Sequence, residues 1–242
     1  MFDWAQISDQ GPRSENEDSV GSWKLASSTL AMAIADGLGG HIGGKLASSL
    51  AIEMFGESIM EDTHPALPTI ALSIHEAIRL KQASSPELRG MATTFSGLIV
   101  SQSQTTPNCA LMRLIHCGDT RISLQRGSGI KRLTVDHTEA QRLLLAGLLT
   151  REQYAAYPRK NILESALGIA STPQLDYDEV NLLTGDRVFI TSDGAHTKVL
   201  LREMKTLSDS SNSALSFVQT MAKKINQRNP DDNFSVAAVF VQ

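Results

Sequence analysis

The sequence lacks the features that mark several large classes of protein. Its 242 residues include only 2 cysteines, which is too few for a disulfide framework. No apolar run approaches the roughly 18 residues needed to cross a bilayer. The first residues, Met-Phe-Asp-Trp-Ala-Gln, have neither the positive charge nor the apolar stretch of a signal peptide. We therefore expect a cytoplasmic protein that contacts no membrane.

Basic charge is also scarce. The chain carries 22 Lys and Arg against 26 Asp and Glu, a formal charge of −4, whereas nucleic-acid binders usually carry a basic excess. Hydrophobic residues make up 41% and charged residues 20%, which is typical of a folded globular protein. We predict a single domain over residues 1–242 that binds no nucleic acid. Because the sequence carries no signal for self-association, we expect a monomer.

Two kinds of local pattern alternate along the chain. Apolar residues at helical spacing are clearest in the stretches 46–55, 70–78 and 214–225. Other segments are apolar or alternate between apolar and polar residues, as β-strands do. These predicted strands are 2–7, 30–35, 94–100, 109–116, 122–126, 175–182, 187–191 and 234–241. Short Gly and Asp turns between several of them favour antiparallel sheets.

Each predicted helix has one apolar face, which must pack against a sheet. Two sheets that pack face to face, with helices on both outer sides, satisfy this requirement. We therefore predict an α+β fold, a four-layer α-β-β-α sandwich of two antiparallel sheets, although a two-layer α+β domain remains open. A mostly helical, Leu- and Arg-rich stretch at about 138–171 separates two runs of strands. We predict that this stretch is a surface flap, with helices at 139–146 and 150–156.

Four carboxylates stand beside the ends of predicted strands. They are Asp36, Asp119, Asp193 and Asp232, and the pair Glu17-Asp18 adds two more acids. Strand ends hold side chains rigidly, and a neighbouring glycine lets the chain turn and expose a carbonyl oxygen. Mg²⁺ and Mn²⁺ take carboxylate, carbonyl and water oxygens. The pattern predicts a divalent-cation site, although Asp-Gly is also a common turn and the spacing alone names no reaction.

The glycine-rich segment 37–44 follows a predicted strand and precedes a predicted helix, as a dinucleotide-binding loop does. However, the third glycine of that motif falls on Ile42, and Asp36 would repel a pyrophosphate. This interpretation is therefore disfavoured.

The segment 116–121 has the outline of a cysteine phosphatase loop. Only three residues separate Cys117 from Arg121, and one of them is Asp119, which would repel phosphate and raise the pKa of the thiol. We expect Cys117 to be an inert buried thiol.

Two further residues are candidates for contact with a ligand. Arg13 lies close to the acidic pair, where an arginine either forms a salt bridge or recognises a phosphate. His41 lies in the glycine-rich segment and is a candidate general acid, although a lone histidine is more often a helix cap or a surface residue.

The motifs follow one another in a fixed order. They are Arg13-Ser-Glu-Asn-Glu17-Asp18, Ala35-Asp36-Gly37-Leu-Gly-Gly-His41, Gly90-Met-Ala-Thr93-Thr94, His116-Cys-Gly-Asp119-Thr-Arg121, Asp136-His-Thr138, Ala166-Leu-Gly168, Gly185-Asp-Arg187, Ser192-Asp193-Gly194 and Asp232-Asn233. In this order and spacing they resemble the motif series of bacterial metal-dependent serine/threonine phosphatases of the PPM (type 2C) family. The resemblance covers nearly the whole chain, from Arg13 to the last predicted strand.

The resemblance implies a β-sandwich with two Mn²⁺ or Mg²⁺ ions in a cleft at one end. It implies that Asp36 bridges the two ions and that the carbonyl of Gly37 binds one of them. Asp193 and Asp232 would bind the other ion. Glu17 and Asp18 would hold metal-bound waters.

The resemblance also implies further roles and shows two departures. Asp119 would bind a third, weaker ion together with Asp193, and Arg13 would bind the phosphate. The usual Gly-Met-Gly-Thr-Thr carries Ala92 here. Eukaryotic members place the general-acid histidine directly after Asp-Gly, where this chain has Leu38, so His41 is only a candidate for that role.

The implied activity is hydrolysis of phosphoserine and phosphothreonine in phosphorylated proteins by a metal-activated water. Such an enzyme would oppose a cognate serine/threonine kinase. One alternative is a catalytically inactive homologue that binds phosphoproteins as a regulator. Another is a carboxylate metalloenzyme with a different phosphoester substrate, such as a nuclease, which the lack of basic charge disfavours.

Overall fold

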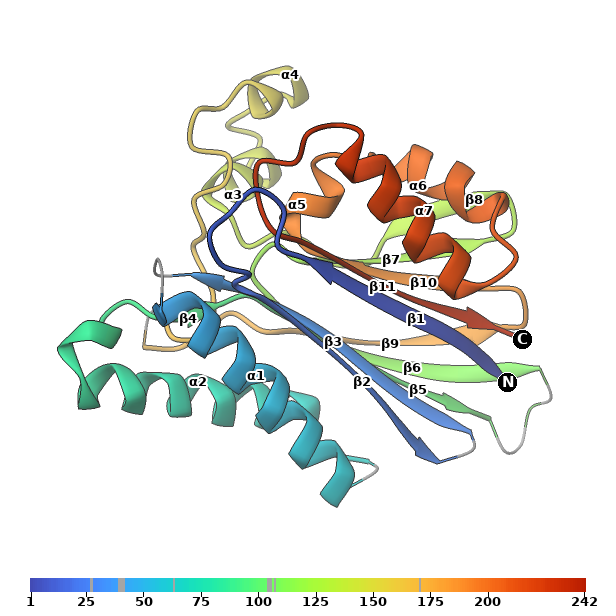
Figure 1. Cartoon of the computed structure of the whole chain (residues 1–242), viewed down its shortest axis with the longest axis horizontal. Helices are drawn as coiled ribbons and strands as arrows, with labels where there is room; N and C mark the ends of the chain where they lie inside the picture. The colour runs from blue at the N-terminus through green and yellow to red at the C-terminus, as the bar shows by residue number, and fades with distance from the viewer. Residues whose placement is uncertain (27, 39–41, 63, 104–105, 107, 170) are drawn as a thin grey trace.

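Two β-sheets pack face to face, with helices on both outer sides (Figure 1). The computed structural model describes residues 1–26, 28–38, 42–62, 64–103, 106, 108–169 and 171–242. One sheet has the order β1 (Phe2–Asp9), β11 (Phe234–Val241), β10 (Arg187–Thr191), β7 (Arg121–Arg126), β8 (Gly129–Arg132). The other has the order β2 (Asp18–Ala26), β3 (Thr29–Leu38), β5 (Phe95–Gln102), β6 (Cys109–Cys117), β9 (Asp176–Leu183), with β4 (Ala92–Thr93) paired to β3. The predicted four-layer sandwich is confirmed.

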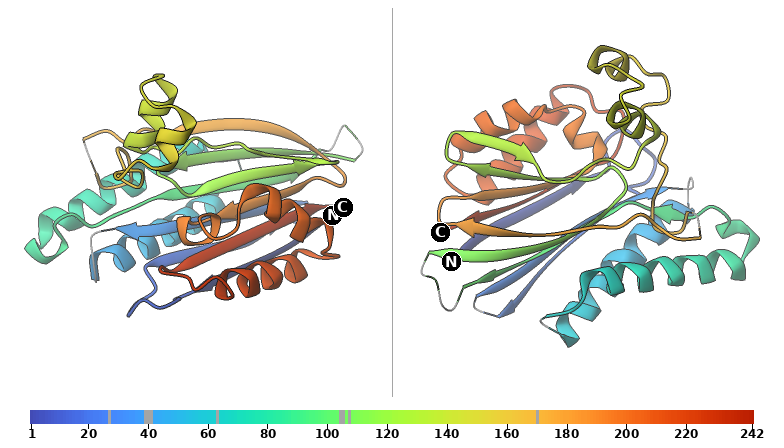
Figure 2. Two further views of the ribbon diagram at one scale, coloured as in Figure 1. Left: turned by 90° about the horizontal axis from the view of Figure 1, so that it is seen from above. Right: turned by 180° about the vertical axis from the view of Figure 1, so that it is seen from behind.

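The helices form the two outer layers. The long helices α1 (Ile42–Glu61) and α2 (Leu67–Ser84) cover the sheet that contains β3, and the short helix η1 (Pro86–Leu88) follows them. Three helices lie on the sheet that contains β11: α5 (Asp193–His196), α6 (Leu201–Asp209) and α7 (Ala214–Asn226). The short helices α3 (Glu139–Leu145) and α4 (Arg151–Ala155) project from one end of the sandwich (Figure 2).

Strand β3 shows how one segment serves two cores. Ala31, Ala33 and Ala35 point into the layer shared with α1 and α2, where Phe55 and Ile74 are buried. The alternate residues, which include Met32 and Ile34, point into the layer between the two sheets. Successive side chains of a strand face opposite ways, so a strand covered on both sides reads as a continuous apolar run.

The predicted strands match observed strands to within three residues at either end. The sequence pattern missed β2, which lies at the edge of its sheet and carries a glycine at its centre. This glycine, Gly21, makes room for Trp23, because a Cβ there would lie 2.1 Å from the Trp23 ring. The pattern also missed the short strands β4 and β8 and the helices α5 and α6. The stretch 138–171 is less helical than predicted, because turns follow α3 at Gly147 and α4 near Pro158.

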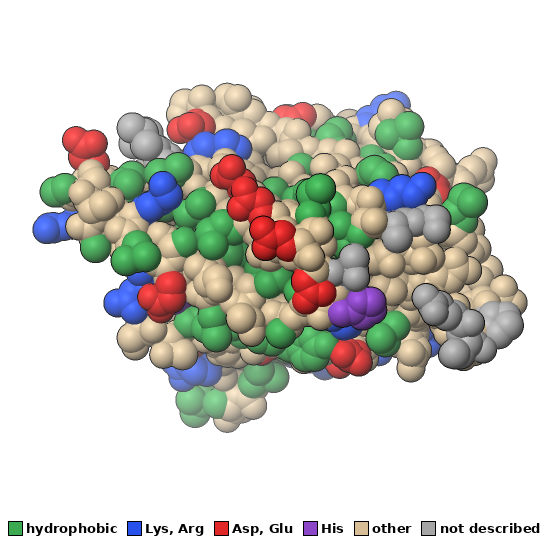
Figure 3. Space-filling view, turned by 90° about the horizontal axis from the view of Figure 1, so that it is seen from below, with side chains coloured by type: hydrophobic (Ala, Val, Ile, Leu, Met, Phe, Trp, Pro, Cys, Tyr) green, Lys and Arg blue, Asp and Glu red, His purple; other side chains and the backbone are tan. Residues whose placement is uncertain are grey.

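The outer face of α1 is acidic. Exposed carboxylates recur at every fourth position, at Glu53, Glu57 and Glu61, as expected for the solvated side of an amphipathic helix. Figure 3 views the molecule from the side on which α1 and α2 lie, and acidic side chains form a line across this surface. Among helices in the described ranges, we find none with both the length and the apolar character of a membrane span.

The third core layer, between the β11 sheet and α7, depends on aromatic contacts. Phe189 is fully buried, and its ring centroid lies 4.5 Å from that of Phe217. We expect Phe189→Ala to lower the free energy of unfolding by about 3–5 kcal/mol, because it removes this contact and leaves a cavity. Urea denaturation measures the change. Leu215→Ala is the control, because its side chain is half exposed on the same layer; an equal loss in both variants would contradict this description of the core.

Candidate metal centre

A cavity of about 430 Å³ at the end of the sandwich brings most of the predicted site residues together. It is lined by Arg13, Ser14, Glu15, Glu17, Asp36, Gly37, Leu38, Asp119, Asn161, Leu163, Asp193, Asp232 and Asn233. Seven of these residues were singled out in the sequence. Asp18 is buried beside the cavity, and His41, the candidate general acid, lies outside the described residues.

The acids reach the cavity from both sheets. Asp36 does not end its strand, as the apolar run suggested, but lies within β3, two residues before the end. Asp119 follows β6, and Asp193 is the first residue of α5. Asp232 lies two residues before the start of β11. The site therefore lies where strands of both sheets end or begin, which fixes the backbone on each side.

Asp18 connects the two sheets below the cavity. It is paired with Asp36 in the β2–β3 register. Its carboxylate accepts a hydrogen bond of 2.7 Å from the hydroxyl of Ser192, which precedes α5. The same hydroxyl accepts a hydrogen bond of 2.9 Å from the backbone N–H of Ser235 in β11. Ser192 was not assigned a role from the sequence, although it lies in the Ser-Asp-Gly motif.

Two glycines allow Glu17 to approach the first turn of α1. A Cβ on Gly44 would lie 2.0 Å from the Glu17 carboxylate oxygen Oε2, and a Cβ on Gly37 would lie 2.2 Å from the carbonyl oxygen of Gly44. The backbone carbonyl of Glu17 also accepts a hydrogen bond from the hydroxyl of Ser48. An acid therefore lies against this first turn, which further disfavours a pyrophosphate-binding loop.

Asn233 and the Thr93-Thr94 pair hold the backbone of two of the acids. The Asn233 side chain accepts a hydrogen bond of 2.9 Å from the N–H of Glu17 and donates one of 2.6 Å to the carbonyl of Gln10. Thr93 donates to the carbonyl of Asp36, and Thr94 accepts from its N–H. Sequence reasoning quoted these residues in motifs but gave them no role, because a motif does not show which backbone groups a side chain will reach.

Burial and mutual repulsion perturb the acids of the centre. Burial, together with the charge of Asp193, raises the pKa of Asp18 to about 6 and that of Asp119 to about 8. Burial raises the pKa of Asp36 well above its ordinary value, and the charge of Asp18 adds to the effect. The pKa of Asp193 is also raised, first by burial and then by the charge of Asp232. Such a group of acids is stabilised by a cation.

The donor chemistry of the cavity fits a hard divalent cation, because it offers carboxylate and carbonyl oxygens. Within the described ranges, however, no three Asp, Glu, His or Cys side chains yet form a set that could hold a metal ion. Asp232 instead forms an ion pair of 2.7 Å with Arg13, which also donates to the carbonyl of Asp231. The predicted metal ligand Asp232 and the predicted phosphate-binding residue Arg13 are therefore paired with each other.

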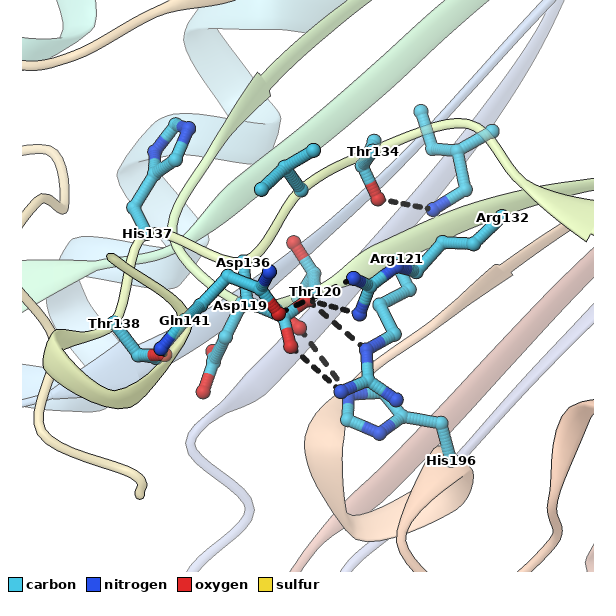
Figure 4. A network of polar contacts seen from close by, with 12 residues as sticks. Asp119, Thr120, Arg121, Arg132, Thr134, Asp136, His137, Thr138, Gln141 and His196 are labelled. Atoms are coloured by element: carbon cyan, nitrogen blue, oxygen red, sulfur yellow. Dashed lines mark hydrogen bonds and ion pairs between the residues drawn. The ribbon is translucent and has the colours of Figure 1, made fainter. Parts of the chain in front are cut away.

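A polar network supports the loop that carries Asp119 (Figure 4). Arg121 donates two hydrogen bonds to Asp136, of 3.0 and 2.6 Å, and Arg132 donates a third of 3.1 Å. On the other side, the Nδ1 atom of His137 accepts a hydrogen bond of 3.1 Å from the N–H of Gly118. These contacts fix the backbone on both sides of Asp119.

The surroundings of Cys117 disfavour a role as a nucleophile. Its side chain is fully buried, and burial raises the pKa of its thiol to about 12. A thiol in this state carries almost no thiolate at neutral pH. The predicted burial of this thiol is confirmed.

Known proteins share both this sequence pattern and this fold. The family profile of protein phosphatase 2C matches residues 9–235. Serine/threonine phosphatase Stp of Listeria monocytogenes is 29% identical over 235 residues, which cover 94% of this chain and 90% of that protein. The structure of the S. agalactiae serine/threonine phosphatase superposes over 100% of both chains, with a TM-score of 0.88 and 26% identity. The catalytic domain of phosphatase PstP, solved with two manganese ions, has a TM-score of 0.79 at 27% identity and covers 99% of this chain and 97% of its own.

We expect the cation-free protein to lose stability as the pH rises from about 4 to about 8. The folded pKa of Asp18 is raised to about 6 and that of Asp119 to about 8, from 3.8, so the folded state holds protons that the unfolded chain has released. The stabilisation is complete below the unfolded pKa and is lost as the pH rises through the folded pKa. Urea denaturation in excess EDTA measures it. Asp119→Asn should flatten the profile between about pH 6 and 8; an unchanged slope would contradict the raised pKa.

Neighbouring glycines at the start of α1 provide a matched pair. Gly44→Ala places a Cβ against the Glu17 carboxylate, whereas Gly43→Ala meets Met91 at 3.2 Å, a contact that a small shift relieves. Helix propensity favours alanine by up to about 1 kcal/mol at either position. We expect Gly44→Ala to weaken Mn²⁺ binding about tenfold by displacing Glu17, with Gly43→Ala close to the wild type. Calorimetric titration with Mn²⁺ measures the two affinities. Equal affinities in the two variants would contradict the close approach of Glu17 to Gly44.

Proposed function

Because this chain belongs to the protein phosphatase 2C family, we propose that it is a metal-dependent serine/threonine protein phosphatase. Its substrates would be phosphoserine and phosphothreonine in phosphorylated proteins, and it would oppose a serine/threonine kinase. The observation that carries the proposal is that seven sequence-predicted residues line one cavity. Five of them are acids: Glu17, Asp36, Asp119, Asp193 and Asp232.

The chain offers oxygen ligands for two divalent cations. In this proposal Asp36, Asp193, Asp232 and the Gly37 carbonyl would hold the two cations. Glu17 and Asp18 would hold metal-bound waters. When bound, Mn²⁺ or Mg²⁺ lowers the pKa of a water molecule and neutralises charge on the phosphate. Asp119 and Asp193 together would hold a third, weaker ion.

Arg13 is placed to orient the phosphate. Its side chain is 56% exposed at the edge of the cavity and reaches inward to Asp232. A guanidinium can exchange one carboxylate partner for two phosphate oxygens, because its donors match either group in a bidentate arrangement. In this proposal Arg13 releases Asp232 when substrate enters and binds the nonbridging phosphate oxygens.

We propose that residues 138–171 form a flap of the single catalytic domain rather than a domain of their own. A backbone bridge between Thr138 and Leu163 closes the segment at its base, and a second bridge, between Leu167 and Thr93, attaches it to the sandwich. Asn161 and Leu163 line the cavity, so the segment can contact the protein chain that carries the phosphate. The cognate kinase, a cytoplasmic location and a monomeric state stay predictions.

The decisive experiment compares hydrolysis of an aryl phosphate and of a phosphothreonine peptide. We expect turnover in Mn²⁺, none in EDTA, and a fall on the order of 100-fold or more in Asp193→Asn, because that change removes a charged oxygen ligand. Cys117→Ser is the matched control and should keep nearly full turnover, because its thiol is buried and protonated.

Three outcomes would contradict the proposal in different ways. Activity that persists in EDTA would exclude a metal-dependent reaction. Loss of turnover in Cys117→Ser would restore the thiolate mechanism. A folded wild type that hydrolyses neither substrate in Mn²⁺ would instead favour an inactive homologue that binds phosphoproteins.

A further inference from the structure

A buried histidine from a different element holds the backbone of Asp119. His196 is the last residue of α5, and more than nine-tenths of its surface is buried. Its Nε2 atom lies 3.1 Å from the carbonyl oxygen of Asp119 (Figure 4). A carbonyl oxygen can only accept a hydrogen bond, so Nε2 must carry the proton and donate.

The same short helix begins at Asp193. The backbone N–H of His196 donates to the carbonyl of Ser192, and the N–H of Thr197 donates to the carbonyl of Asp193. One hydrogen-bonded turn therefore carries Asp193 at its start and, at its end, the side chain that holds Asp119. The separation of the two acids is set through this turn, although 73 residues lie between them in the chain.

A histidine at this position destabilises the fold relative to an apolar side chain of similar size. Within the described residues its Nδ1 atom is buried and has no hydrogen-bond partner. An unsatisfied buried acceptor costs stability, and an apolar side chain of similar size would avoid the cost. What an apolar side chain would not supply is the hydrogen bond to Asp119.

We infer that His196 is a positioning residue, which fixes Asp119 relative to Asp193 so that the two carboxylates together hold a weakly bound divalent cation. The inference rests on the proposed function, because it assigns to these two acids a shared ion. His196 itself touches neither the ion nor the substrate in this assignment.

Two substitutions separate the hydrogen bond from the packing. His196→Gln places its amide nitrogen near the position of Nε2 and keeps a donor for the Asp119 carbonyl. His196→Met fills a similar volume without any donor, and we expect it to be at least as stable as the wild type because no acceptor is left unsatisfied.

His75 offers the matched control. It is another fully buried histidine, and its Nδ1 atom accepts a hydrogen bond of 3.1 Å from the N–H of Gly168. It lies in α2, on the opposite outer layer from α5. His75→Met therefore removes an equivalent buried ring without altering the support of Asp119.

The experiment titrates Mn²⁺ calorimetrically into the full chain and its variants, with thermal unfolding measured on the same samples. The weak site is the one that disappears in Asp119→Asn. We expect His196→Met to weaken that site at least about tenfold and to spare the tighter sites, as losses of supporting hydrogen bonds do. His196→Gln should stay within about threefold of the wild type, and His75→Met should match the wild type in all Mn²⁺ sites.

The possible failures are distinguishable. If the wild type binds Mn²⁺ and hydrolyses phosphopeptide but His196→Met keeps the weak site, or if His75→Met loses it equally, the positioning role is overturned and the proposed function stands. The role is also overturned if Asp119→Asn loses none of the Mn²⁺ sites of the wild type, or if the weak site is lost equally in His196→Gln and His196→Met. A folded wild type that binds no Mn²⁺ overturns both.

Discussion

The repulsion between buried carboxylates at one end of the sandwich is the constraint on which the rest of the structure depends. Asp18, Asp36, Asp119 and Asp193 are largely withdrawn from water, and each has a pKa that burial raises and that the neighbouring charges raise further. A flexible chain would relieve this repulsion by moving the acids apart. The fold prevents that movement because each acid is attached to a strand or to a short turn that follows one, and a divalent cation then supplies the charge that the cluster lacks.

The hydrogen bonds around the cluster act mainly on backbone and on neighbouring sheets. The Ser192 hydroxyl connects Asp18 of one sheet with Ser235 of the other, so the two layers are held in register where the cavity opens. Asn233 attaches the segment that carries Glu17 to the start of β11. These partners therefore fix the positions of the segments that carry the acids.

Sequence reasoning predicted the layers and most of the site because both depend on patterns of residue type. Alternation along β3 and the apolar stripes of the long helices follow from burial, and the acids follow from their place beside strands and glycines. The edge strand β2 was not predicted, because Gly21, which accommodates Trp23, interrupts its apolar pattern. The role of His196 was not predicted, because its partner is a backbone carbonyl of a loop distant in the chain, and no local spacing of residues indicates such a contact. Likewise, residue types alone did not decide that Arg13 pairs with Asp232 here.

The central claim is that acids distant in the chain form one pocket of oxygens that binds a pair of divalent cations. Anomalous diffraction from crystals soaked in Mn²⁺ tests this claim most directly, because it locates the ions without reference to activity. The account predicts two strong peaks in the cavity, with Asp36 between them and with Asp193 and Asp232 turned toward one of them, and Arg13 separated from Asp232. Crystals that bind no Mn²⁺ in the cavity, or in which these three aspartates point to different places, would contradict it.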